Sequence, residues 1–362
     1  MYAPLSTDTL AVRDLARDFA KQDVGPAAAA WDADAALPAR PVEALGALGV
    51  LGLAVPEAAG GAGLGALELV VVAEELAAQS GVLAHHVAVL AGQLALWSDA
   101  APAHPDLARA LAGSLRVGGG LQGAPALTLD ASGRVHGVLD PVLGAQRAER
   151  ALVNAIGADG VPRVVLCDPS APGVTRTARS GELGLRGVDL GRWVFDGAAV
   201  EDLGPLRLRA AARASALERL ALAGVALGLG RAALDDAARY AAERKQFGQA
   251  IAEFQAVSFK LADCATELDA ARLLAHASAQ APSADADEDP ELGAQLSLVL
   301  ALKAAARATD EALQIHGGYG YTRDFPVERY WRDARALGAL AGPVDALALD
   351  AGAALLDAGE VP

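Results

Sequence analysis

The sequence predicts an α+β protein, mainly α-helical, in which a small β region separates two helical regions. Before about residue 116 and after about residue 205, apolar residues recur at the three- and four-residue steps of a helix. Between those positions, short β-rich runs alternate with Gly, Pro and Asp. We therefore expect an N-terminal helical domain (1–116), a middle β domain (117–205) and a C-terminal helical domain (206–362).

The N-terminal helices are predicted from their periodicity and from the residues that interrupt it. Leu10, Leu15 and Phe19 alternate with charged residues, which is typical of an amphipathic helix. Pro and Gly clusters then punctuate the chain, such as the one from Gly60 to Gly65. Helices are expected over 5–23, 41–52, 67–76, 81–98 and 105–114.

The middle and C-terminal regions differ in their period. Strands are expected over 134–139, 151–155, 163–166 and 193–195. After Pro205 the helical period returns, and the acidic segment 281–290 is expected to be an exposed loop between two helices, the second of which leads to Gln314. One buried helix face is expected to comprise Val257, Leu261, Cys264, Leu268, Ala271 and Ala275.

Composition limits the classes of function. The net charge of −15 argues against a nucleic-acid partner, which requires clustered Lys and Arg. The apolar run 69–72 is too short for a membrane span, and charged residues interrupt the first helical pattern, so we expect a cytoplasmic protein without a signal peptide there. Cys167 and Cys264 lack the spacing of a metal site, so we expect two reduced thiols.

Two motifs in the last third carry candidate chemistry. RKQFG spans Arg244 to Gly248, and QIHGGYG spans Gln314 to Gly320. The planar guanidinium of Arg matches pyrophosphate oxygens, and paired glycines let a ligand touch the backbone. Local physics equally allows a solvated Arg at a helix end and a simple glycine C-cap. His316, inside the second motif, is expected to be a packing or capping residue and not a base.

These motifs resemble those of the acyl-CoA dehydrogenase family, which binds FAD. LGVLGLAVPEAAGGAGLGALELVVVAEELA, at 48–77, is similar to the family's first signature. YAAERKQFGQAIAEFQAVSFKL, at 240–261, and QIHGGYGYTRDFPVERYWRDAR, at 314–335, are similar to the second and third. The resemblance spans most of the chain and implies a helical domain, a β-barrel-like middle domain and a C-terminal four-helix bundle.

The resemblance also implies ligands and partners. The substrate would be an acyl-CoA thioester, oxidised to the 2,3-enoyl-CoA, and the electron acceptor an electron-transfer flavoprotein. In the family, the last two motifs reach across a subunit interface to the FAD of a neighbouring chain. The residues that the resemblance places against the pyrophosphate and adenosine end of FAD are Arg244, Gln246, Phe247, Gln255, Gln314, Gly317 and Gly318.

Three segments depart from the family pattern where a chain would hold its own FAD. The family's Thr-Glu-Pro and Gly-Ser-Asp loop is replaced by LQGAPALTLDASGRV, at 121–135. The family's Trp-Ile-Thr segment falls at 141–144, which reads Pro-Val-Leu-Gly. Its Tyr-Glu-Gly-Thr segment, which carries the catalytic base, falls at 340–343, and the Glu position is Ala341, which cannot accept a proton.

This pattern resembles the heteromeric members of the family, in which two related chains form an α2β2 assembly with fewer flavins than chains. Such assemblies are common in bacterial steroid side-chain catabolism. We therefore expect a subunit that completes a partner's flavin site. One alternative is a self-sufficient homo-oligomer whose base is Glu218, a position that some family members use. The other is a non-catalytic scaffold or acyl-binding chain.

Glu218 also has a purely structural interpretation, as an acidic residue in the early turns of a helix, paired with Arg213 or Arg219. Three further pairs are interpreted structurally. His85-His86 lacks a nearby acidic or cysteine ligand, so we expect no metal site. Glu74-Glu75 is expected to share a helix surface, and Arg332-Asp333 to form a structural ion pair.

Overall fold

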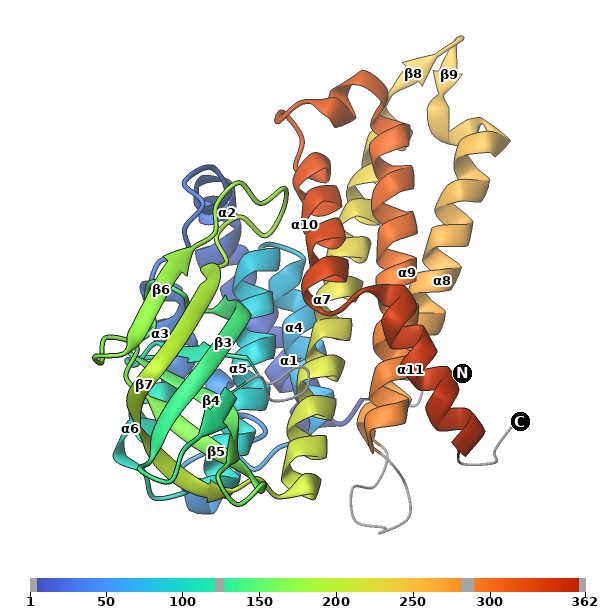
Figure 1. The fold of residues 1–362 in the computed structure, drawn as a ribbon. Helices are drawn as coiled ribbons and strands as arrows, with labels where there is room; N and C mark the ends of the chain where they lie inside the picture. The colour runs from blue at the N-terminus through green and yellow to red at the C-terminus, as the bar shows by residue number, and fades with distance from the viewer. Residues whose placement is uncertain (1–4, 121–126, 281–289, 358–362) are drawn as a thin grey trace.

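The computed structural model describes residues 5–120, 127–280 and 290–357 (Figure 1). A seven-stranded sheet lies on one side of the molecule, the N-terminal helices pack behind it, and long C-terminal helices stand beside them. The chain is therefore mostly helical with a central β domain, as the sequence predicts. The domain boundaries, the barrel-like form of the sheet and the four-helix bundle stay predictions.

The predicted N-terminal helices are found close to their expected positions, and a further helix at 25–33 was not predicted. Ser6 caps the first helix because its hydroxyl accepts a hydrogen bond from the Thr9 amide at 3.0 Å. Pro26 lies in the first turn of the second helix, where its missing N–H has no cost. The helices are α1 (Thr7–Phe19), α2 (Gly25–Ala33), α3 (Arg40–Ala47), α4 (Ala66–Ala77), α5 (Gly81–Ala100) and α6 (Pro105–Leu111), and a π-helical turn (Ala20–Val24) joins α1 to α2.

The sheet contains the four expected strands and three that the sequence analysis missed. Its strands are β1 (Val117–Gly119), β2 (Leu127–Leu129), β3 (Arg134–Leu143), β4 (Arg150–Gly157), β5 (Pro162–Cys167), β6 (Val174–Ala178) and β7 (Leu190–Pro205). The missed strands are β1, β2 and β6. β4 runs parallel to β1 and β2, whereas β7 pairs antiparallel with β3, β5 and β6.

The C-terminal helices pack around α7, which is 36 residues long. Gly224 and Gly228 let α7 approach α4 closely, because a Cβ at Gly228 would lie 2.3 Å from the Glu74 carbonyl oxygen. The helices are α7 (Leu208–Glu243), α8 (Gln255–Gln280), α9 (Pro290–His316), α10 (Val327–Leu340) and α11 (Val344–Asp357). Short elements between them are the hairpin β8 (Lys245–Gln246) and β9 (Gln249–Ala250) and the 3-10 helix η5 (Gly317–Tyr321).

Two hydrophobic cores hold the fold together. One is shared by the N- and C-terminal helices, and the other lies within the sheet around Trp193 and Phe195. The indole N–H of Trp193 donates to the Ala145 carbonyl at 2.9 Å, so its burial leaves no polar atom unpaired. Cys167 and Cys264 are free and buried, and burial raises their thiol pKa values to about 12 and about 11.

Glu74 and Glu75, expected to share a helix surface, do lie side by side, but that surface is buried. Both are buried within α4, where arginines from three other helices neutralise them. Glu74 pairs with Arg231 of α7 and Arg272 of α8, and Glu75 pairs with Arg17 of α1 and with Arg231. The pair is part of a buried ionic cluster, because charge in the interior requires opposite charge nearby.

Arg332 and Asp333 do not pair with each other, which corrects the second structural expectation. Arg332 binds Asp32 of α2 at 2.8 Å and Glu328 at 2.7 Å. Asp333 instead accepts a hydrogen bond from the Leu185 amide at 2.7 Å. Burial raises the pKa of Asp333 to about 6. The two residues face different partners because successive side chains on a helix diverge.

Further expectations on the C-terminal helices have mixed outcomes. On α8, Cys264, Leu268, Ala271 and Ala275 are buried, whereas Val257 and Leu261 are only half-buried. The acidic loop expected at 281–290 falls almost wholly outside the described residues. By length and hydropathy alone, α5 resembles a membrane span. α10 and α11 also do so if they are counted as one helix with a bend of 46° between them. The apolar window of α5 is 94% buried within the protein, which is typical of a core helix.

Candidate functional site

The first motif forms a hairpin at the end of α7. Phe247 and Gly248 have positive φ values of +52° and +89° and form the two-residue turn between β8 and β9. The Phe247 ring is 94% exposed. Arg244 ends α7, and its side chain is also exposed. The hairpin therefore projects the motif into solvent at one end of the molecule.

The second motif ends α9 at the same end of the molecule (Figure 1). Gly317 has a φ of +58°, which ends the helix and begins η5. A Cβ added at Gly317 or Gly318 would have no neighbouring atom within 4 Å, so the backbone here faces open space. We call the β8–β9 hairpin and η5 together the tip.

Aromatic side chains hold the two parts of the tip together. The Tyr240 ring of α7 stacks on the His316 ring of α9, with 4.4 Å between their centroids. Phe325 contacts both rings, at 5.6 Å and 5.2 Å. His316 Nδ1 donates to the Ala312 carbonyl at 2.8 Å, so His316 packs and bonds to its own helix, as expected. Tyr240 and Phe325 were not predicted as site residues, although Tyr240 opens the second signature.

The tip contains a hollow of about 450 Å³. Four of the seven predicted FAD-binding residues line it, namely Arg244, Gln246, Gly317 and Gly318. The other three, Phe247, Gln255 and Gln314, are exposed but do not line the hollow. The structure therefore brings the two motifs together at one surface.

The residues of this surface could hold the phosphate end of a dinucleotide. Within the described part of the chain, the Arg244 guanidinium forms no ion pair, so its donors remain available for phosphate oxygens. The backbone at Gly317 and Gly318 is open to close approach. Asp324 also lines the hollow and would repel a phosphate placed next to it, which restricts the orientation of a bound dinucleotide.

Glu218 lies in a different environment, deep within α7. It is 3% exposed and faces Gly92 of α5, where an ideal Cβ would lie 3.2 Å from a Glu218 carboxylate oxygen. It is the eleventh residue of α7, so it does not lie in the early turns of a helix. Arg219 pairs with Glu291, and Arg213 donates to the Ala54 carbonyl. The part of the structural interpretation that placed Glu218 in the early turns of a helix is therefore wrong.

The structure does not bring Glu218 to the tip. Arg244 follows Glu218 by 26 residues of one continuous helix, which corresponds to about 39 Å at 1.5 Å per residue. A reaction centre that uses both Glu218 and the tip residues of one chain would require a bound group that spans this distance. The two predicted sets of site residues are therefore separate.

The positions that depart from the family pattern differ in burial: Ala341 is buried and Leu143 half-buried, whereas Pro141 and Pro343 are exposed. Ala341 is buried after α10 and offers no ionisable group, and Leu143 packs against the helical core. Neither can hydrogen-bond a cofactor through its side chain. Residues 121–126 of the replaced loop lie outside the described residues.

Comparisons with known proteins identify the family. The family description "Acyl-CoA dehydrogenase, C-terminal domain" matches residues 208–356, and "Acyl-CoA dehydrogenase, N-terminal domain" matches 6–102. The chain is 30% identical to the 3-(aryl)acrylate reductase of Clostridium sporogenes, over 90% of this chain and 92% of that protein.

Solved structures are similar over nearly the whole length. One, described with the electron transferring flavoprotein of Acidaminococcus fermentans, has a TM-score of 0.88 and 26% identity, and the match covers 98% of this chain and 100% of the other. Another, described as the Tcur3481-Tcur3483 steroid ACAD, has a TM-score of 0.83 and 27% identity, with 97% and 98% covered.

Proposed function

The chain belongs to the acyl-CoA dehydrogenase family of flavoprotein oxidoreductases, and from that membership we propose that it is one subunit of a heteromeric enzyme. The assembly oxidises an acyl-CoA thioester to the 2,3-enoyl-CoA. In this proposal, the tip of our chain completes the FAD site of a related partner subunit. The chain's own position for a flavin binds it weakly or not at all.

The observation that carries the proposal is the separation of the tip from the interior positions. The tip presents a guanidinium that forms no ion pair with the described residues, open glycine backbone and an exposed aromatic ring. The interior positions Leu143 and Ala341 offer no hydrogen-bonding side chain. Glu218, the candidate base of the same chain, is about 39 Å from the tip along α7. A flavin bound at the tip therefore belongs more simply to a second chain than to a reaction centre at Glu218.

Each tip residue has a distinct part in holding the cofactor. Arg244 would bind the pyrophosphate with two parallel hydrogen bonds, and Gly317 and Gly318 would allow it to approach the backbone. Gln246 and Gln314 would donate and accept hydrogen bonds with the adenosine end. When bound, FAD supplies the hydride acceptor for the β-carbon of the acyl group. The tip residues orient the cofactor and do not move a proton.

The names of the similar structures support two narrower proposals. A steroid acyl-CoA dehydrogenase with two named components is similar over nearly the whole chain, which supports a steroid side-chain thioester as substrate and a related chain as partner. The likeness to a structure described with an electron transferring flavoprotein supports such a protein as the electron acceptor.

Purification of the chain alone and together with candidate partner subunits tests the proposal. We expect the lone chain to carry little flavin and the complex to carry less than one flavin per chain, measured by absorbance after denaturation. Stoichiometric FAD in the lone chain would overturn the proposal.

Substitution of the tip tests the role of Arg244 in the complex. Arg244→Ala should lower FAD affinity about 10- to 100-fold, because a charge-assisted hydrogen bond contributes about 1.5–3 kcal/mol. Arg239→Ala is the matched control, since Arg239 is an exposed arginine of the same helix that pairs with Asp236. Unchanged flavin content and activity in Arg244→Ala would favour the non-catalytic scaffold.

The burial of Glu218 favours a second candidate function, a self-sufficient dehydrogenase with Glu218 as base. A carboxylate in a dry site near the substrate α-carbon is what proton abstraction requires. In that case Glu218→Gln should abolish turnover while retaining flavin and substrate binding. Near-normal turnover of this variant would eliminate the second candidate.

A further inference from the structure

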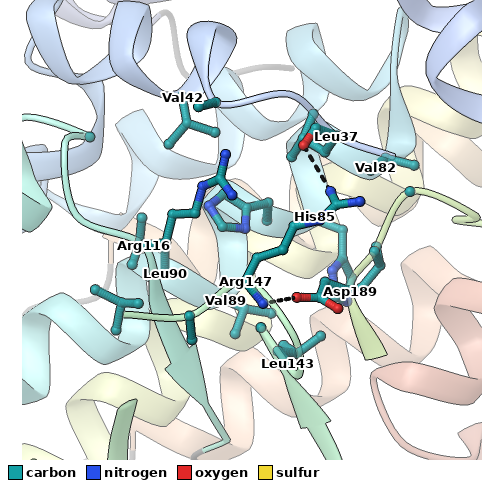
Figure 2. Close-up of a pocket in the computed structure, with 18 of the residues that line it drawn as sticks. Leu37, Val42, Val82, His85, Val89, Leu90, Arg116, Leu143, Arg147 and Asp189 are labelled. Carbon is teal, nitrogen blue, oxygen red and sulfur yellow. Dashed lines mark hydrogen bonds between the residues drawn. The ribbon is translucent and has the colours of Figure 1, made fainter. Parts of the chain in front are cut away.

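A second hollow lies between α3, α5 and the top of the sheet (Figure 2). Its internal volume is about 80 Å³. Val82, Val89 and Leu90 of α5 and Leu143 of β3 form apolar walls. Neither Glu218 nor Gly92, the α5 residue that Glu218 faces, lines the hollow. The hollow is therefore distinct from the surroundings of Glu218 and from the tip.

Two buried polar side chains of α5 line this hollow without a hydrogen-bond partner. His85 and Gln93 are each 2% exposed. Within residues 5–120, 127–280 and 290–357, His85 Nδ1 and Gln93 Nε2 have no hydrogen-bond partner. A buried polar atom without a partner is costly, so each of these positions calls for a bound oxygen or nitrogen atom. Burial lowers the pKa values of His85 and His86 to about 4, so both imidazoles are neutral at physiological pH.

Two arginines stand at the rim of the same hollow. Figure 2 shows Arg116 and Arg147 extending toward the end where Leu37 and Val42 lie. Arg147 donates to the Leu37 carbonyl at 3.2 Å, and neither guanidinium forms an ion pair with a carboxylate of the described chain. Both side chains therefore retain donors that a bound anion could use.

The carboxylates near the rim already have other partners or lie outside the hollow. Asp189 accepts the amides of Gln146 and Arg147 at 3.0 Å and 2.8 Å. Glu149 accepts the Arg116 amide at 3.1 Å. Glu43 and Glu149 line a neighbouring surface hollow with the two arginines, not the apolar interior. These acids moderate the positive charge but leave the guanidinium donors free.

We propose that this hollow is a binding site for a small organic acid with a short apolar body. The carboxylate lies at the rim, held by Arg116 and Arg147, and the body enters the apolar interior. A volume of about 80 Å³ corresponds to two or three water molecules at roughly 30 Å³ each, which is room for about three carbon atoms. A hydroxyl or carbonyl oxygen on that body would satisfy His85.

Isobutyrate is a suitable probe, and isobutyramide is its neutral isostere. We expect saturable binding of isobutyrate to the full chain, detected by ligand-observed NMR, and much weaker binding of isobutyramide. Arg116→Met should weaken isobutyrate binding about tenfold, because it removes a charge-assisted hydrogen bond. Arg134→Met is the control, since Arg134 is exposed at the opposite end of β3 and should leave binding unchanged.

A cavity-filling variant provides the second, independent test. Val89→Phe should abolish binding because the larger ring occupies the apolar interior, and a thermal melt checks that the variant still folds. If that variant does not fold, the Arg116→Met comparison decides alone. The proposal is overturned by equal binding of isobutyramide, by unchanged binding in Arg116→Met, or by a crystal structure with only ordered water at His85 and Gln93.

Discussion

The tip and the interior positions of this protein differ in how completely the chain surrounds them. At the tip, predicted site residues such as Arg244 and Phe247 face solvent, and open space surrounds Gly317 and Gly318. In the interior, Glu218 and Ala341 are buried, and Leu143 is half-buried against the helical core. A set of exposed groups that could bind a phosphate, and that no described residue of the chain covers, is typical of a surface that another molecule completes.

The largest effect on stability is expected in the buried ionic cluster, which tests how tightly the interior is packed. Glu74→Ala should lower the free energy of unfolding by roughly 3–5 kcal/mol, because Arg231 and Arg272 lose the buried carboxylate between them. Urea denaturation measures the effect.

A matched substitution near the tip serves as the control for the cluster. Glu311 pairs with Lys260 at 2.5 Å, but both side chains are partly exposed. Glu311→Ala should therefore cost about 1 kcal/mol or less. Equal costs for Glu74→Ala and Glu311→Ala would show that the interior is no more tightly coupled than the tip.

The buried Asp333 should make the stability of the interior depend on pH. Burial raises its pKa from 3.8 to about 6 in the folded chain. The folded state therefore binds this proton more tightly, so the contribution to stability is complete below about pH 3.8 and is lost as the pH rises through about 6. Nearby Asp32 raises the pKa further, while Arg332 and Arg329 oppose the increase.

Asp333→Asn removes this titration and can keep the hydrogen bond from the Leu185 amide. At neutral pH the variant should gain up to about 3 kcal/mol in the free energy of unfolding. At low pH the two proteins should be nearly equal. Denaturation over a pH series checks both values, and a variant that is less stable than the parent at neutral pH would contradict the expectation.

The smallest effect on stability is expected at Phe247. Asn at the first position of a two-residue turn accepts a positive φ more readily than Phe, so Phe247→Asn should change the stability of the lone chain by about 0.5 kcal/mol or less, toward stabilisation. Association with a partner should weaken about tenfold, because an exposed aromatic ring is lost. Analytical ultracentrifugation of the complex measures this, and unchanged association would exclude Phe247 from the interface.

Sequence reasoning found the long elements and missed the short ones. The four strands with clear β-rich runs are present, but β1 is Val-Gly-Gly and β6 is Val-Thr-Arg-Thr-Ala, and neither carries an apolar alternation that could identify it. β1 is a strand because β4 pairs with it in parallel across a long separation in the chain. Tertiary pairing of this kind leaves no local signature.

In the candidate site too, local features were predictable from the sequence and contacts between helices were not. RKQFG and QIHGGYG were recognisable from their residues, and the two glycines with positive φ lie where a turn and a helix end require them. The stacking of Tyr240 on His316, which joins the motifs, depends on the meeting of α7 and α9. The burial of Glu74 could not be predicted from α4 alone, because a single helix gives no information about the arginines of three others.

The residues alone therefore determined the order of helical and β regions, the two glycine-containing motifs and the loss of an ionisable group at Ala341. These are local properties that depend on side-chain chemistry and on the period of apolar residues. The tertiary structure decided that Arg244 and Gly317 share one exposed surface, that Glu218 lies about 39 Å away along α7, and that His85 lines a hollow. Distances between segments far apart in the chain depend on packing, which no local pattern records.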